Sequence, residues 1–149
     1  MRILLISDSH SVLVNEDFTK YDLVLHCGDY GISKSVLDNN HVKYVIGNCD
    51  DYGEYEYIFT FNGRKIFMAH GHQYGVKMGY DRIKYRALEN GCSILVFGHT
   101  HIPIWQPEDG LLTMNPGAYM DGFKIEITDD YIYYILDQRI YKKFEFKWW

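Results

Sequence analysis

The chain has 149 residues, a length that fits one domain spanning residues 1–149 with room for a proper core. Apolar residues make up 47% and charged residues 23%, a globular balance that argues against disorder. The net charge of −5 disfavours a stable complex with nucleic acid or with an anionic membrane. The N-terminal apolar stretch is too short for a signal peptide and no run is long enough to span a bilayer, so we expect a cytoplasmic protein.

The first half alternates between apolar runs and more polar stretches. Arg2–Ile6, Leu23–His26 and Tyr44–Ile46 are short and mostly apolar, which is typical of buried strands. Ile32–Asn39 fits a short helix, and residues 11–20 fit a loop or a short helix. Strands that alternate with helical stretches predict a parallel β-α-β arrangement.

The middle of the chain contains a hairpin signal. Tyr55–Phe61 and Arg64–Ala69 have the character of strands, and Asn62-Gly63 separates them. Asn-Gly between two strands favours a tight turn because both turn residues need positive φ. The sequence therefore predicts an antiparallel pair here.

A helix and a further strand follow the hairpin. Lys77–Glu89 predicts a helix that ends at Asn90-Gly91. Its expected buried side consists of Met78, Ile83, Ala87 and Leu88. Ser93–Phe97 is the next apolar run and predicts a buried strand.

The last third is mostly strand. Asp109-Gly110 predicts another hairpin turn. Phe123–Thr128, Tyr131–Leu136 and Ile140–Lys147 predict a meander. The pattern as a whole indicates an α/β fold with one mostly parallel sheet and one more antiparallel sheet.

Polar residues gather where the apolar runs end, and this is the most informative feature of the sequence. Five predicted strands are each followed by Asp, Asn or His. The five clusters are Asp8-Ser9-His10, Gly28-Asp29, Gly47-Asn48-Cys49-Asp50, His70-Gly71-His72 and Gly98-His99-Thr100-His101. Ligands of open α/β sheets bind at the carboxyl ends of the strands, so we expect these clusters to converge.

The convergent side chains suit divalent metal ions. Imidazole, carboxylate and amide ligands without thiolate favour Mn²⁺, Fe²⁺, Zn²⁺ or a similar ion. Asp8-x-His10 and His99-x-His101 each place two such groups near a common point. One ion would not need so many ligands, whereas two ions that share a bridging carboxylate would use them all. Paired ions about 3.5–4 Å apart are typical of hydrolases that attack phosphorus.

Each cluster by itself has an ordinary alternative interpretation. Asp-x-His is a weak pattern, and Gly-Asp after a strand is usually a turn. His26 and His41 fit no ligand spacing and are interpreted as ordinary core or surface histidines. The indication of a site comes from all five clusters together.

These five clusters, in this order, resemble the five motifs of the calcineurin-like metallophosphoesterases. The Gly-Asn-Cys-Asp form, the short length and Asn115-Pro116-Gly117 are similar to the small single-domain phosphodiesterase group of YfcE type. The resemblance covers residue 1 to about residue 118. It implies a four-layer α–β–β–α sandwich with two mixed sheets and the metal site at the carboxyl ends of the strands.

By position, the resemblance also implies the cofactor and its ligands. We expect two divalent ions, Mn²⁺ first and Ni²⁺, Fe²⁺ or Zn²⁺ as alternatives. One ion would be held by Asp8, His10, Asp29 and His101. The other would be held by Asp29, Asn48, His70 and His99, so that Asp29 is the bridge.

The implied reaction is hydrolysis of phosphodiester bonds in small or nucleotide-type substrates by a hydroxide that bridges the metals. Candidate catalytic residues are Asp29, Asn48 and His72, and candidate substrate-binding residues are Asn48, Cys49 and His72. Cys49 stands where many relatives carry a histidine that could protonate the leaving group. A thiol replaces imidazole poorly, so His72 or a metal-bound water would be the acid, or the substrates carry good leaving groups. Alternatively, Cys49 is a small residue that fits a tight site.

Two other functions stay open. The same fold serves elsewhere as a non-catalytic interaction scaffold. Phe144, Phe146 and Trp148 alternate in the last predicted strand and would form a partner surface, cover the core or line a homodimer seam. A phosphomonoesterase of the same superfamily is the second alternative. A chain this short leaves little room for a protein-substrate groove, so we favour a small phosphate ester as substrate.

Overall fold

The computed structural model describes residues 1–148, which form two sheets, two α-helices and three short 3-10 helices. The first sheet contains, from edge to edge, β11 (Arg139–Glu145), β10 (Tyr131–Leu136), β9 (Phe123–Ile127), β1 (Ile3–Ile6), β2 (Leu23–His26) and β3 (Lys43–Tyr44). The second sheet contains β4 (Glu56–Phe61), β5 (Arg64–Ala69), β6 (Ile94–Val96), β8 (Leu111–Asn115) and β7 (Ile104–Glu108). The helices are α1 (Lys34–Asn39), α2 (Asp81–Glu89), η1 (Phe18–Lys20), η2 (His72–Tyr74) and η3 (Tyr119–Asp121).

Both sheets are mixed, as the family resemblance implied. β1, β2 and β3 are parallel, and β9, β10 and β11 extend that sheet in antiparallel order. In the second sheet β5, β6 and β8 are parallel, and β4 and β7 pair antiparallel at the edges. The prediction of one mostly parallel and one more antiparallel sheet is therefore wrong. The reason is a long-range pairing: β9 lies beside β1, and its Ile125 and Ile127 complete the core between the sheets.

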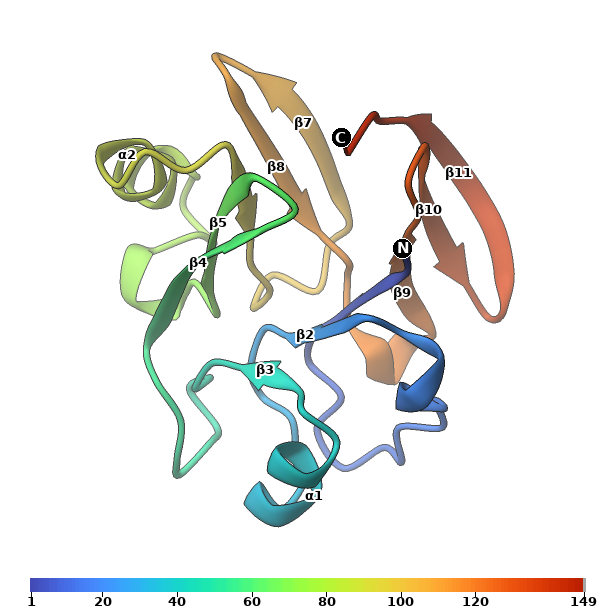
Figure 1. The fold of residues 1–149 in the computed structure, drawn as a ribbon. Coiled ribbons are helices and arrows are strands. Elements are labelled where there is room, and N and C mark those ends of the chain that lie inside the picture. Colours follow the sequence, from blue (N-terminus) through green and yellow to red (C-terminus); the bar gives the residue numbers. More distant parts are fainter. Residues whose placement is uncertain (149) are drawn as a thin grey trace.

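Alternating side chains divide the core into layers. Along β1, Ile3 and Leu5 belong to the cluster between the two sheets, whereas Leu4 belongs to the cluster beneath α1. β5 alternates in the same way, and its Phe67 packs with Ile83 of α2. A strand that is buried on both faces has a continuous apolar run in its sequence, which is why β1 and β5 were predicted correctly. The layer order α1, first sheet, second sheet, α2 confirms the four-layer sandwich (Figure 1).

The two predicted hairpin turns are confirmed. Asn62 and Gly63 have φ of 48° and 79°, and Asp109 and Gly110 have φ of 56° and 74°. Each pair joins neighbouring antiparallel strands. Positive φ at both central residues gives the tight turn that matches the twist of the strands.

α2 is shorter than the predicted helix over Lys77–Glu89. Gly79 has φ of 152°, which an α-helix cannot contain, so the residues before Asp81 form turns. Met78 is therefore 94% exposed instead of lying on the buried side, and Leu88 is exposed as well.

The remaining predicted strands agree with the observed ones to within two residues at each end.

The C-terminal aromatic side chains belong to the core. Phe144 stacks on Trp105 of β7, with the ring centroids 4.0 Å apart. Trp148 is 2% exposed, and Arg64 donates from Nε to its carbonyl oxygen over 3.0 Å. Phe144 and Phe146 both pack against the cluster between the sheets. Of the three interpretations of this alternation, the one in which the side chains cover the core is correct.

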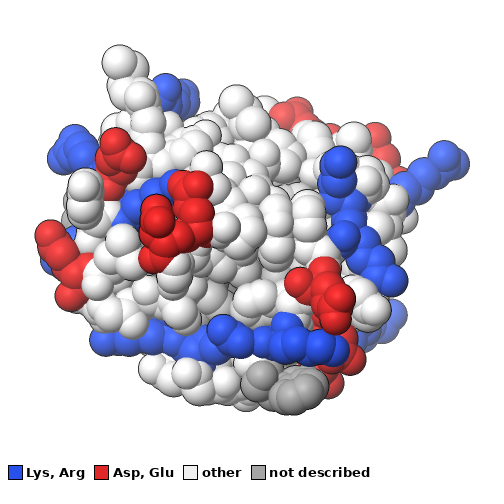
Figure 2. Space-filling model, turned by 90° about the horizontal axis from the view of Figure 1, so that it is seen from above, with Lys and Arg blue, Asp and Glu red and all other residues white. Residues whose placement is uncertain are grey.

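The charge on the surface in Figure 2 is mixed. A row of Lys and Arg side chains lies along one margin, and Asp and Glu side chains lie among other basic ones around a broad uncharged area. This face is therefore not the continuous basic surface typical of proteins that bind nucleic acid. Among residues 1–148, no helix is both long and apolar enough to cross a membrane.

Candidate metal centre

The structure brings the seven predicted metal ligands together at one end of the sandwich. Their loops follow β1, β2, β3, β5 and β6, and each leaves the carboxyl end of its strand. Two groups of ligand atoms form, each with its members within 4.8 Å of one another: Asp8, His10 and His101 in one, and Asp29, His70 and His99 in the other. Asn48 joins the second group, because its Oδ1 lies 3.1 Å from His70 Nε2.

Asp8 has one oxygen held by the protein and one oxygen left over. Its Oδ2 accepts hydrogen bonds from the Ser7 hydroxyl and from the His99 backbone N–H. Its Oδ1 is buried, accepts no hydrogen bond from the described part of the chain, and lies 3.2 Å from His101 Nε2 and 3.8 Å from His10 Nε2. A buried carboxylate oxygen without a donor is costly, and a cation at this point would satisfy it.

His70, in the second group, also has a buried polar atom that a cation would satisfy. Its Nδ1 donates to the Cys27 carbonyl oxygen over 2.6 Å, which leaves a lone pair on Nε2 in the neutral ring. That Nε2 faces Asp29 Oδ2 at 3.3 Å and His99 Nδ1 at 3.2 Å. Burial opposes protonation of His70, but the hydrogen bond with Asp29 and the charge of Asp8 outweigh it and raise its pKa. Facing lone pairs need a proton or a cation between them, so the residues fit a metal ion.

Asp29 lies between the two groups. Its Oδ2 is 3.3 Å from His70 Nε2 and 3.9 Å from His10 Nε2. Its Oδ1 accepts a hydrogen bond from the Cys49 backbone N–H over 2.8 Å. Burial works against its ionised form, yet a hydrogen bond that protonated His70 would donate and the one from the Cys49 backbone N–H prevail and lower its pKa. A carboxylate in this position can contact two ions at once.

The backbone of the cluster is strained. Five of the seven predicted ligands have φ between 48° and 67°, in the left-handed region: Asp8, His10, Asp29, His99 and His101. Such a conformation costs a residue with a side chain on the order of 1–3 kcal/mol, and residues of this kind cluster at functional sites. The sequence carried no signal for it.

Two glycines permit the loops to approach one another. A Cβ on Gly47 would lie 2.1 Å from Asp29 Oδ1, and a Cβ on Gly98 would lie 1.9 Å from Ser7 Oγ and 2.7 Å from Asp8 Oδ2. No larger residue fits at either position without moving a carboxylate of the cluster. The Gly-Asn and Gly-His pairs of the sequence therefore have a steric reason.

The predicted substrate-side residues border the same cluster. The His72 ring centroid is 5.3 Å from that of His70 and 6.0 Å from that of His99. Burial, followed by the neighbouring His70, lowers the pKa of His72. Cys49 Sγ lies within 4.8 Å of ligand atoms of His10 and Asp29, and burial and the charge of Asp29 raise its pKa. Asn48 and Cys49 are exposed, so both are accessible to a bound molecule.

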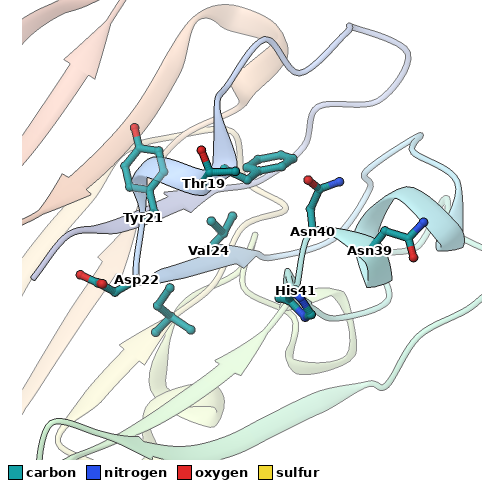
Figure 3. A pocket seen from close by; sticks show the side chains of 9 residues that line it. Thr19, Tyr21, Asp22, Val24, Asn39, Asn40 and His41 are labelled. Carbon is teal, nitrogen blue, oxygen red and sulfur yellow. The ribbon is translucent and has the colours of Figure 1, made fainter.

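Sequence reasoning gave no role to two residues that support the cluster. Asp50, the last residue of the third motif, accepts hydrogen bonds from the backbone N–H groups of Asp29 and Gly47, each over 2.7 Å. His26, interpreted as ordinary, is fully buried at the end of β2 beside Ser9. The place of Asp50 in its motif was a usable signal, whereas nothing local distinguished His26. His41 lines a separate hollow at the opposite end of β2, which Thr19, Tyr21 and Asp22 also line (Figure 3).

Known proteins resemble this chain in sequence. The family model described as "Calcineurin-like phosphoesterase superfamily domain" matches residues 1–137. The "Probable metallophosphoesterase YsnB" of Bacillus subtilis is 36% identical over 131 residues, which cover 79% of this chain and 75% of that protein. A phosphodiesterase of Methanocaldococcus jannaschii is 27% identical in an alignment of 154 positions, gaps included, and the match covers 82% of this chain and 88% of that protein.

Solved structures resemble it in fold. A protein of Streptococcus pneumoniae TIGR4, described as a predicted phosphoesterase, has a TM-score of 0.82 at 25% identity and covers 97% of both chains. Yfce, a phosphoesterase from E. coli, has a TM-score of 0.70 at 21% identity over 97% of this chain and 98% of that one. Vps29 of Entamoeba histolytica complexed with zinc has a TM-score of 0.74 at 22% identity over 99% of both chains. The family match over most of the chain and the identity to the Bacillus relative show that this protein belongs to the calcineurin-like phosphoesterase superfamily.

Proposed function

We propose that the chain, as one domain, is a dinuclear metal-dependent phosphoesterase that hydrolyses phosphodiester bonds of small or nucleotide-type substrates. The observation that carries the proposal is the pair of ligand groups with Asp29 between them. Asp8, His10, Asp29 and His101 would hold one ion. Asp29, Asn48, His70 and His99 would hold the other.

The charge of the site supports an anionic substrate. Asp8 and Asp29 are the only carboxylates in the proposed ligand sets, so two divalent ions would leave a surplus of roughly two positive charges. Bound divalent ions supply Lewis-acid stabilisation of phosphoryl oxygens and a water with a pKa near 7. The fixed side chains of the chain hold these charges where the phosphate would lie. A protein with a net charge of −5 can thus bind an anion at one point.

The residues at the open side of the cluster would meet the substrate. Asn48, Cys49 and His72 lie at its rim, and we assign them contact with the phosphate or the leaving group. A diester is favoured because a relative is named a phosphodiesterase. Among the divalent ions that suit nitrogen and oxygen ligands, Mn²⁺ is our first choice, with Ni²⁺, Fe²⁺ and Zn²⁺ as alternatives.

The non-catalytic scaffold is less well supported. The sequence feature that favoured a scaffold was the alternating C-terminal aromatic pattern, and those side chains cover the core. The structural likeness to Vps29 is one of fold. Turnover by the metal-loaded protein distinguishes the two functions.

The proposal is tested by stripping the protein with EDTA and reloading it with Mn²⁺, Ni²⁺, Fe²⁺ or Zn²⁺ in turn. We expect hydrolysis of bis-p-nitrophenyl phosphate to disappear and to return with metal, and to exceed hydrolysis of p-nitrophenyl phosphate. His101→Ala should lose activity and bound metal. His41→Ala is the matched control, because His41 also has positive φ (54°) but lies away from the cluster. Two retained ions and full turnover in His101→Ala would contradict the proposal.

A further inference from the structure

His26 is a fully buried histidine that lies outside the proposed ligand sets. It is the last residue of β2, and its two ring nitrogens contact the loops that follow β1 and β2. Nδ1 lies 3.2 Å from the Gly28 backbone nitrogen, and Nε2 lies 2.9 Å from the Ser9 hydroxyl oxygen. A polar ring buried this completely needs both contacts.

The neighbours of His26 determine its tautomer. The Ser9 hydroxyl donates its hydrogen to the Tyr30 carbonyl oxygen over 2.7 Å, so it can only accept from His26. Nε2 of His26 therefore carries the hydrogen, and Nδ1 accepts the N–H of Gly28. The ring is neutral, which agrees with the burial and the neighbouring His70 that lower its pKa to about 3.

These hydrogen bonds join two loops that carry proposed ligands. Ser9 lies between Asp8 and His10, and Gly28 immediately precedes Asp29. The loops are also paired through the backbone, from Asp8 N–H to the Gly28 carbonyl (2.9 Å) and from His10 N–H to the Asp29 carbonyl (2.8 Å). His26 adds the side-chain bonds that hold both loops to the end of one strand.

The loops need this support because their backbone is strained. Asp8, His10 and Asp29 have φ of 55°, 48° and 56°. Such conformations persist only where surrounding contacts leave the chain no alternative. The carboxylates and the imidazole can meet a common ion only while all three residues keep this conformation.

We propose that His26 is a positioning residue that, through Ser9 and Gly28, holds the Asp8–His10 loop against the Asp29 loop and so determines the geometry of both metal positions. The inference rests on the proposed two-metal site. Because Asp29 belongs to both ligand sets, movement of its loop lowers the affinity for both ions together. Hydrogen-bond partners behind metal ligands typically change metal affinity 10- to 100-fold when they are removed.

Three variants test the inference. His26→Asn keeps an acceptor near Gly28 and loses the donor to Ser9, His26→Gln keeps a donor toward Ser9, and Ser9→Ala removes only the hydroxyl. The control is Leu37→Ala, because Leu37 is the buried residue of α1 and lies in a cluster that contains none of the proposed ligands. Mn²⁺ affinity is measured by titration calorimetry, and the melting temperature is measured in EDTA.

We expect about a 10- to 100-fold loss of Mn²⁺ affinity at both positions in His26→Asn and Ser9→Ala, and a smaller loss in His26→Gln. Leu37→Ala should lower the melting temperature at least as much while its affinity stays within about threefold of the wild type. Wild-type affinity in a folded His26→Asn or Ser9→Ala overturns the inference, and if His26→Asn does not fold, Ser9→Ala alone decides. A wild-type protein that binds no Mn²⁺ instead overturns the proposed function and the inference together.

Discussion

Ile66 and His70 lie four residues apart on β5 and the loop after it, and both are at most 1% exposed. Ile66 packs among apolar side chains between the sheets. His70 lies among a carbonyl, a carboxylate, an amide and a second imidazole. Burial of the apolar side chain of Ile66 stabilises the fold. Around His70, burial instead brings together polar atoms whose lone pairs face one another, and only a proton or a cation between them would satisfy them. The same strands thus supply a stable core and, at their ends, a site that needs a ligand.

The strongest expected effect separates activity from folding. Asp29→Ala should reduce bis-p-nitrophenyl phosphate turnover about a thousandfold, because it removes the ligand shared by both ions and with it several kcal/mol of transition-state stabilisation. Steady-state kinetics in Mn²⁺ measure the loss, and His41→Ala is the control. Turnover within tenfold of the wild type would show that Asp29 does not bridge.

The converse change should damage the core and spare the site. Ile66→Ala should lower the free energy of unfolding by about 3 kcal/mol, since it leaves a cavity between the sheets. Urea unfolding in EDTA measures this cost. Calorimetry on the folded fraction should give the wild-type affinity for Mn²⁺. A change in affinity as large as that of His26→Asn would mean that core and site are not separable.

A pH series sharpens the comparison through His26. Its pKa is lowered from 6.5 to about 3 in the folded state by burial and by His70, so the unfolded chain takes up a proton first as the pH falls. Stability is therefore lost as the pH drops from about 6.5 towards about 3, by about 2 kcal/mol at pH 5. His26→Gln should lack this contribution. Urea unfolding in EDTA at pH 7 and pH 5 compares the two proteins, and equal losses would contradict the assignment.

The smallest effect concerns backbone strain. His101 has φ of 63°, so His101→Gly should be more stable than His101→Ala by about 1 kcal/mol in the metal-free state. The same pair of substitutions at His41, with φ of 54°, should give a similar difference without any change in activity. Urea unfolding measures both pairs. An alanine variant as stable as its glycine counterpart would show that position 101 is not strained.

Local patterns predicted much of this molecule. Asn62-Gly63 and Asp109-Gly110 formed their turns, and Leu23–His26 and Arg64–Ala69 were predicted residue for residue. The ligand candidates were found because each follows a strand directly. The errors were of two kinds. Met78 is exposed because a glycine turn interrupts the helical pattern, and the C-terminal strands joined the sheet of β1.

The sequence alone determined the succession of strands along the chain, the turns, and which polar residues follow the strands. These features depend on side-chain periodicity and on residues that are neighbours in the sequence. Only the tertiary structure decided which strands share a sheet, which ligands have left-handed φ, and that His26 and Asp50 tie the loops together. The physical reason is distance along the chain. Hydrogen bonds between loops twenty residues apart, and the apolar match of β9 to β1, exist only after the chain has folded.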